Sequence, residues 1–298
     1  MNLSIGLRRL SALKIIVAGL LLALLSACSA VKLAYNNGHE LAWWWLSDYI
    51  DVKGDDRNTL RQAVHQLHEW HRREQLPSYV ELLRSWQVPV GGDLDVEQIC
   101  RMADDVLKRA AALAAAAQAI DAPALMVLAR LNAAQLAEME RNFAKSNRKF
   151  REKYVDVNPR QLLATRLDAA LSRAEWLYGS LGRTQEQALR AALQASPWDA
   201  LDALQSRQRR QQDIAHTLRQ LSQSQATPEQ ARAALGAMLA RQLDPQEPQE
   251  RSRMLASRQQ SCQVLAQLHA STTPAQRAKA QGTLRDYATD LGALVAVR

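Results

Sequence analysis

Motifs that mark several common enzyme classes are missing from this sequence. It contains no Gly-x-Ser-x-Gly nucleophile turn, no glycine-rich phosphate loop, no Cys-x-x-Cys pair and no His-Glu-x-x-His zinc motif. We therefore expect a protein that is not an enzyme and that has no catalytic residue, no metal site and no cofactor.

Residues that favour β-strands are also scarce. The 298 residues include only 2 Phe against 7 Trp, and no segment alternates regularly between apolar and polar residues. Alanine, leucine, glutamine and arginine dominate, and these are strong helix formers. Because 47% of the residues are hydrophobic, the chain can bury a core and is not a disordered tail. The composition predicts an all-α fold.

The first 28 residues have the layout of an export signal. Arg8, Arg9 and Lys14 precede an apolar and small-residue run of 11 residues at 15–25. This length suits the hydrophobic region of a signal peptide, whereas a bilayer span needs about 20 apolar residues. The leader carries three of the eight net positive charges, which leaves about +5. That mild excess suits solvated helix faces, and it also suits lipid headgroups or acidic polymers.

The end of this leader, Leu25-Ser26-Ala27-Cys28, resembles the lipobox of bacterial lipoproteins. In that group the cysteine thiol receives diacylglycerol, cleavage occurs just before it, and the new amino terminus is acylated by chains such as palmitate. The resemblance implies that 1–27 is a cleaved signal peptide and that Cys28 carries the membrane anchor. The alternatives are an ordinary secretory signal and a core helix that contains a cysteine.

Ser29, rather than aspartate, follows the cysteine, and this resembles lipoproteins sorted to the outer membrane. We therefore expect the periplasmic face of the outer membrane and no nucleic-acid partner. In an oxidising compartment Cys100 and Cys262 could form a disulfide. Two buried, unpaired thiols are the alternative.

After a lipidated tether at 28–38, we expect one helical periplasmic domain at 39–298. Its first helix, 39–50, contains Trp43-Trp44-Trp45. Three consecutive side chains cannot share one helix face, so at least one lies at a margin. We expect the cluster to pack into the end of the bundle; contact with the membrane interface, where Trp is enriched, is the alternative.

The next helix, 56–87, is expected to kink or restart at Pro77, and 88–92 is expected to be a loop. His65, His68 and His71 lie on one side of this helix, which favours a half-exposed stripe over a zinc site. His71, Glu74 and Tyr79 could form a polar site near the kink, and we expect a structural hydrogen-bond cluster there instead of a catalytic one. The candidate motif of this region consists of Trp70, His71, Arg72, Pro77 and Tyr79.

Six later helix starts share one pattern, a capping residue followed three positions later by Gln. The capping side chain accepts from the third helical amide, and the Gln side chain returns to the amide of the cap. With these starts and short connections we predict a bundle of about nine to eleven helices. The six pairs are Asp95–Gln98, Asn132–Gln135, Asn158–Gln161, Thr184–Gln187, Thr227–Gln230 and Thr273–Gln276.

The order of several segments resembles a family of bacterial putative lipoproteins known only as a domain of unknown function. The resemblance implies an all-helical periplasmic lipoprotein and implies no activity. The segments are the lipobox, a short segment at Tyr35, 43–49, Trp70-His71-Arg72, 76–79, Leu131-Asn132-Ala133-Ala134-Gln135 and 143–154.

Two of the capping segments are also similar to the LTxxQ motif of Spy-type periplasmic chaperones. These are Thr227-Pro228-Glu229-Gln230 and Thr273-Pro274-Ala275-Gln276. Ala226 and Thr272 stand where that motif has leucine, and capping alone explains the pattern. The similarity implies a helical holdase for unfolded proteins.

A non-enzymatic binding or scaffold protein with an envelope protein or polymer as its partner is therefore the leading hypothesis. A holdase is the alternative. A concave face lined with apolar and arginine side chains would favour the holdase, and a closed bundle without an apolar patch would favour the scaffold.

Overall fold

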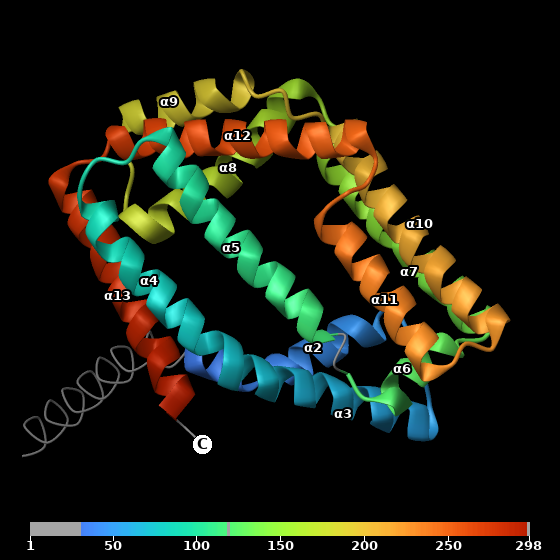
Figure 1. The fold of residues 1–298 in the computed structure, drawn as a ribbon. Coiled ribbons are helices and arrows are strands. Elements are labelled where there is room, and N and C mark those ends of the chain that lie inside the picture. The colour runs from blue at the N-terminus through green and yellow to red at the C-terminus, as the bar shows by residue number, and fades with distance from the viewer. Residues whose placement is uncertain (1–30, 118–119, 297–298) are drawn as a thin grey trace, which may run out of the picture.

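The computed structural model describes residues 31–117 and 120–296 (Figure 1). These residues contain α-helices and one π-helical segment, and no β-strand. The all-α prediction is confirmed. The predicted signal peptide at 1–27 and the predicted lipid site at Cys28 lie outside the described residues.

The helices follow one another through short connections. The described residues hold the twelve α-helices α2 to α13 and one π-helical segment, and residues 31–36 are helical as well. Because α3, η1 and α4 form one continuous run, the number of separate segments is slightly above the predicted nine to eleven. The elements are α2 (Gly38–Ser47), α3 (Gly54–Trp70), η1 (His71–Gln75), α4 (Leu76–Gly91), α5 (Val96–Ala117), α6 (Ala122–Ala129), α7 (Ala133–Tyr154), α8 (Pro159–Tyr178), α9 (Arg183–Gln194), α10 (Ala200–Ser224), α11 (Pro228–Leu243), α12 (Pro248–Ala270) and α13 (Pro274–Ala296).

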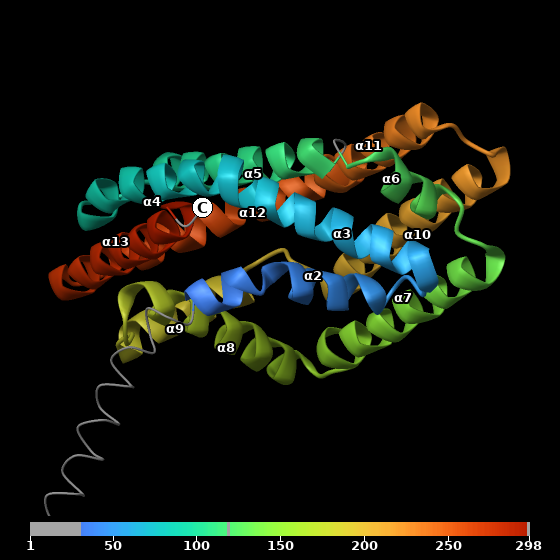
Figure 2. The same cartoon turned by 90° about the horizontal axis from the view of Figure 1, so that it is seen from below.

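The bundle has an open, frame-like arrangement. Figure 1 shows α3, α4 and α13 along two sides, α12 with α8 and α9 across the top, and α7, α10 and α11 on the right. The helix α5 crosses the middle of this frame. The view from below places α4 and α5 in one layer and α2, α8 and α9 in another (Figure 2). None of the helices in the described ranges combines the length and apolarity needed to cross a bilayer.

Two hydrophobic cores hold the frame together. The first, here the Trp43 core, joins α2, α3, α6, α7, α10 and α11 and includes Trp43, Leu60, Leu131, Met139 and Leu218. The second, here the Cys262 core, joins α4, α5, α8, α12 and α13 and includes Val90, Ile99, Tyr178, Cys262 and Leu284. The most extensive helix pair, α4 with α13, borders the second core.

Five of the six predicted capping boxes are present, with reciprocal side-chain and backbone hydrogen bonds. The sixth prediction is wrong, because Gly182 rather than Thr184 precedes α9. The Gly182 amide donates to Gln185 Oε1 at 2.9 Å, and Gln185 Nε2 donates to the Ser271 carbonyl at 2.9 Å. This contact with the α12–α13 turn sets where α9 begins. The five boxes start at Asp95, Asn132, Asn158, Thr227 and Thr273.

The predicted helix 56–87 is longer than expected and continuous, from Gly54 to Gly91. Its irregularity before Pro77 is the π-helical segment η1, whose wider turn accommodates a residue that cannot donate a backbone hydrogen bond. The loop predicted at 88–92 is wrong, because α4 continues through Pro89. Val90 is only 2% exposed, and Gln281 Nε2 donates to the Gln87 carbonyl at 2.9 Å. Packing against α13 therefore offsets the hydrogen bond that Pro89 cannot make.

The predicted tether at 28–38 is shorter than expected. Residues 31–36 are helical, and Lys32 Nζ lies 3.3 Å from Asp290 Oδ1 on α13. The Tyr35 hydroxyl donates to His71 Nδ1 at 2.8 Å. The chain is therefore attached to the domain from Lys32 onward. The predicted helix 39–50 is observed as α2, which ends three residues earlier.

Candidate functional site

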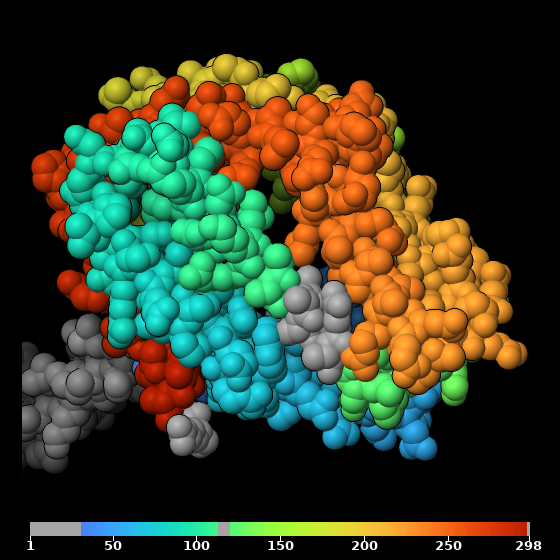
Figure 3. Space-filling view, in the orientation of Figure 1, coloured from blue at the N-terminus to red at the C-terminus, as the bar shows by residue number. Residues whose placement is uncertain are grey.

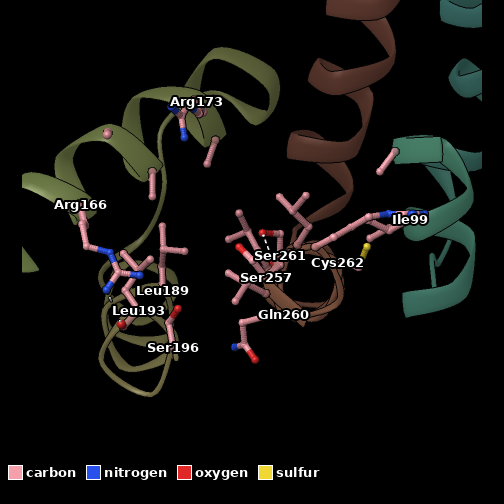
Figure 4. A pocket seen from close by; sticks show the side chains of 18 of the residues that line it. Ile99, Arg166, Arg173, Leu189, Leu193, Ser196, Ser257, Gln260, Ser261 and Cys262 are labelled. Carbon is pink, nitrogen blue, oxygen red and sulfur yellow. Dashed lines mark hydrogen bonds between the residues drawn. The ribbon is translucent and has the colours of Figure 1, made fainter. Parts of the chain in front are cut away.

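A cavity of about 800 Å³ lies beside the Cys262 core, within the size range of small-molecule sites. The helices α8 and α9 form one wall, and α5 and α12 form the opposite wall (Figure 4). The space-filling view shows the surface hollowed between α5 and α12 (Figure 3).

Small side chains on the facing helices create this space. The helix α8 presents Ala169, Ala170 and Ala174, and α12 presents Ser257 and Ser261. Larger apolar side chains complete the wall, and no aspartate or glutamate is among the described lining residues. The larger apolar residues include Trp86, Ile99, Met102, Val106, Phe150, Leu177, Leu189, Leu193, Trp198, Val264, Leu265 and Leu268.

Three arginines line the cavity, and only one is neutralised within the described residues. Arg258 on α12 forms an ion pair with Asp104 and donates to the Cys100 carbonyl at 3.3 Å. Arg166 on α8 donates to the Leu193 carbonyl at 3.1 Å and has no acidic partner there. Arg173, two turns further along α8, is exposed and forms no ion pair with a described residue. The lining therefore carries excess positive charge.

The position of Arg166 is fixed by its surroundings. Its guanidinium carbon lies 4.8 Å from the centroid of the Trp198 ring, which is a cation–π contact. Burial lowers the pKa of Arg166, yet a guanidinium stays charged in a protein. The site thus holds a partly buried cation whose only hydrogen bond to a described residue goes to one carbonyl oxygen.

Cys100 and Cys262 form a disulfide in the structure, with their Cα atoms 5.4 Å apart. The sequence left open whether these cysteines form a disulfide or remain two buried, unpaired thiols, and in the structure they are bonded. The bond joins α5 to α12 and therefore fixes two parts of the same cavity wall.

The polar cluster predicted near Pro77 holds the start of the domain in place. The Tyr35 hydroxyl donates to His71 Nδ1, and His68 Nε2 donates to the Tyr35 carbonyl at 2.9 Å. Arg72 donates to Asn36 Oδ1 at 2.9 Å, and its guanidinium carbon lies 5.5 Å from the Tyr35 ring centroid. We call this set of contacts the Tyr35 latch.

The remaining predicted residues of this cluster lie at its edge. The Tyr79 ring centroid is 5.4 Å from that of His71, and Pro77 is the second residue of α4, two positions after the end of η1. Trp70 is half-buried and takes no part in the hydrogen bonds of the described latch residues. The sequence thus located the cluster but not its partner segment, Lys32 to Asn36.

Burial shifts the pKa values of the titratable side chains in the Tyr35 latch. Burial lowers the pKa of His68 and of His71, and it raises the pKa of Tyr35 to about 12. Both histidines are therefore neutral at pH 7, and neutral His71 can accept from Tyr35.

The histidines of α3 and η1 contact two different aromatic residues. The rings of His65 and His68 lie 4.9 Å and 5.4 Å from the ring of His39, and His68 and His71 contact Tyr35. Across residues 31–117 and 120–296, no group of three or more His, Cys, Asp or Glu residues is placed to hold a metal ion.

The three consecutive tryptophans separate as helix geometry requires. Trp43 is 3% exposed and packs in the first core, while Trp44 and Trp45 are each 66% exposed. Packing into the bundle is therefore confirmed for Trp43 and wrong for the other two, because only one of three successive positions can face the core.

Sequence reasoning missed the cavity and its arginines. The available signal is the spacing of Arg166 and Arg173, seven residues apart, which places both on one helix face with Ala169, Ala170 and Ala174. Nothing in the sequence shows that α12 lies opposite this face.

A family of unknown function (DUF6279) matches residues 48–232, which is more than half of the chain. The chain belongs to this family. No curated protein and no solved structure matches this chain. The resemblance to an uncharacterised family is thus confirmed. In this DUF6279 protein the matched range includes η1, α5, α8 and α9, whereas α12, the opposite cavity wall, lies beyond it.

Proposed function

We propose that this DUF6279 protein is a lipid-anchored binding protein of the bacterial cell envelope that holds a ligand in the cavity between α8 and α12. The observation that carries the proposal is an apolar space of about 800 Å³ with arginine in its wall. Pockets with mostly apolar linings and a few placed polar groups are the usual form of ligand sites.

A role in binding rather than catalysis agrees with the chemistry of the lining. The described lining residues include no Asp, Glu or His that could act as a general base, and the arginines stay protonated. Burial raises the pKa of Tyr178 to about 12. Its hydroxyl donates to Nδ1 of the fully buried His269, whose Nε2 donates to the Gly92 carbonyl at 2.7 Å. Both nitrogens of that histidine are thus occupied within the fold.

The proposed location is the periplasmic face of the outer membrane. Support comes from the lipobox-like sequence that ends at Cys28 and from the Ser29 that follows. Four residue steps separate Cys28 from Lys32, an extended reach of at most roughly 14 Å. Lipidation at Cys28 would hold the α2 side of the domain close to the bilayer. The exposed Trp44 and Trp45 suit that position, because Trp favours membrane interfaces.

The anchor is tested by Cys28→Ala in the full chain. Intact-mass analysis and membrane fractionation should show loss of the acyl mass and release from the membrane pellet. Unchanged mass and pelleting would contradict the proposed anchor.

The binding role is tested by filling the cavity. Full-length protein is extracted in mild detergent and analysed by native mass spectrometry, in which we expect a co-purified ligand. Ala170→Trp should abolish the adduct because its ring enters the cavity. Ala164→Trp, an exposed substitution on the same helix outside the lining, is the matched control. Absence of any adduct from the wild type, or equal adducts in both variants, would contradict the proposal.

A holdase is the second candidate, favoured by the combination of apolar and arginine side chains in a hollow. The cavity volume suits a few side chains or one small molecule better than a long unfolded segment, so it ranks second. The full chain in nanodiscs should then suppress aggregation of an unfolded client at near-stoichiometric amounts, and Ala170→Trp should remove this effect. No suppression with several clients would exclude the role.

A further inference from the structure

We infer that the ligand of the cavity is an anionic single-chain amphiphile, a hydrocarbon chain that ends in a carboxylate. This inference rests on the proposed binding function and adds the chemical class of the ligand. It is carried by two independent features of the wall, an apolar lining for the chain and uncompensated arginines for the head.

The apolar part of the wall suits a flexible hydrocarbon chain. The lining between α5 and α12 consists mainly of aliphatic side chains such as Ile99, Val264 and Leu268. The Ser261 hydroxyl forms a local hydrogen bond, since its Oγ donates to the Ser257 carbonyl at 2.9 Å. Burial of a chain against such a wall is favourable by roughly 25 cal/mol per Å² of apolar area.

The charged part of the wall requires an anion. Arg258 is neutralised by Asp104, whereas Arg166 and Arg173 have no acidic partner among the described residues. Figure 4 shows both arginines on the α8 wall, across from Gln260, Ser261 and Cys262 on α12. A partly buried cation without a counter-ion is unfavourable, and a ligand carboxylate would supply that counter-ion.

Arg166 is also prepared geometrically for a carboxylate. Its stacking on Trp198 and its hydrogen bond to the Leu193 carbonyl restrict the guanidinium, yet they use only part of its five N–H donors. A restricted guanidinium with free donors can form the bidentate contact that carboxylates favour. Arg173 lies on the same face of α8 and can contribute attraction over a longer range.

The test uses matched photoreactive probes on the full-length protein in its own membrane fraction. One probe is palmitic acid with a diazirine in its chain, and the other is its methyl ester, which has the same chain without the charge. After irradiation, labelled peptides are quantified by mass spectrometry. We expect the acid to label the α8 and α12 peptides at least fivefold more than the ester.

Variants then assign the preference to the arginines. Arg166→Gln and Arg173→Gln together should reduce acid labelling at least fivefold and leave ester labelling unchanged. Arg173→Gln alone alters an exposed side chain that forms no ion pair or hydrogen bond with a described residue, so it reports on binding without affecting folding. Arg160→Gln, an exposed arginine of α8 outside the lining, is the matched control.

The outcomes separate this inference from the proposed function. Equal labelling of the cavity by acid and ester would overturn the anionic class and leave cavity binding intact. A preference for the acid that survives both arginine substitutions would overturn the assigned recognition. Absence of labelling in the cavity by either probe would overturn the inference and the proposed function together.

Discussion

The Trp43 core and the Cys262 core are built from similar amphipathic helices, yet they border different cavities. The cavity beside the Cys262 core has a mostly apolar lining, whereas the one beside the Trp43 core, about 710 Å³ between α7 and α10, is lined mainly by polar and charged side chains. In the Trp43 core large side chains fill the space between helices, and Trp43, Leu131 and Met139 are almost completely buried. In the Cys262 core alanines of α8 face serines of α12. The size of the facing side chains, rather than the pattern of the helices, decides which core borders an apolar cavity.

The two regions also differ in whether their arginines have an acidic partner. At the margin of the Trp43 core Arg241 NH2 lies 2.8 Å from Asp213 Oδ1, so the arginine has a counter-ion. In the cavity Arg166 has none among the described residues. The first arrangement supports the fold, and the second is suited to a ligand that brings its own negative charge.

The largest expected effect comes from shortening one side chain in each region. Met139→Ala should lower the free energy of unfolding by about 2–5 kcal/mol, because it opens a cavity in a core filled by large side chains. Leu189→Ala should cost at least about 1 kcal/mol less, because it enlarges a cavity that already exists. Urea denaturation measures both. Equal losses would show that the two cores are packed alike.

Removing the disulfide tests whether the stability of the Cys262 core depends on a covalent bond between α5 and α12. Changing both Cys100 and Cys262 to Ala should reduce stability by about 2–4 kcal/mol, since the bond closes a long loop in the unfolded chain. Hydrogen exchange should increase first in α5 and α12. Dithiothreitol should reproduce the loss in the wild type and have no effect on the double variant. A wild-type midpoint that dithiothreitol leaves unchanged would show that the thiols are unpaired.

Most of the helical architecture could be predicted from the sequence because its signals are local. A capping residue and a Gln three positions later act within one turn, so five of six boxes were located correctly. The exception at Thr184 and the helical Pro89 both depend on distant partners, Ser271 and Gln281. Local patterns carry no information about such contacts.

The candidate site could not be predicted, because it requires knowing which helices face each other. Ala170 and Ser261 are unremarkable helix residues until α8 and α12 are placed across a gap. The Tyr35 latch was half predictable for the same reason. The sequence singles out Trp70-His71-Arg72 and a short segment at Tyr35, but it places Tyr35 in a tether and does not predict its contacts with His71 and Arg72.

Replacing a small residue by a larger one should change the stability of the protein in opposite directions in the two regions. Ala124 is fully buried in the Trp43 core, so Ala124→Leu should destabilise the protein by about 1–3 kcal/mol through overpacking. Ala170→Leu extends into the cavity and should be neutral or slightly stabilising. Thermal denaturation with and without the photoprobe acid gives a second readout, because Ala170→Leu should reduce the stabilisation by ligand. Destabilisation of equal size in both variants would contradict an open cavity.

The smallest expected effect concerns the Tyr35 latch, which sits on η1 between α3 of the first core and α4 of the second. Tyr35→Phe removes the hydroxyl that donates to His71 and should cost about 0.5–1.5 kcal/mol. Tyr79→Phe is the matched control, because its ring also contacts His71 but its hydroxyl makes no hydrogen bond with a described residue. A cost for Tyr79→Phe as large as that for Tyr35→Phe would assign the effect to ring packing.

The same latch gives the stability a defined pH dependence. Because burial lowers the pKa of His68 and His71, the unfolded chain binds protons at a higher pH than the folded chain does. Their contribution to stability is therefore complete above the unfolded pKa of about 6.5 and is lost as the pH falls toward the folded values. Protonated His71 can no longer accept from Tyr35, so hydrogen exchange at 31–36 should increase over this range. In His71→Gln the slope of the urea midpoint against pH should be shallower, and an unchanged slope would mean that protonation of His71 does not contribute to the pH dependence of stability.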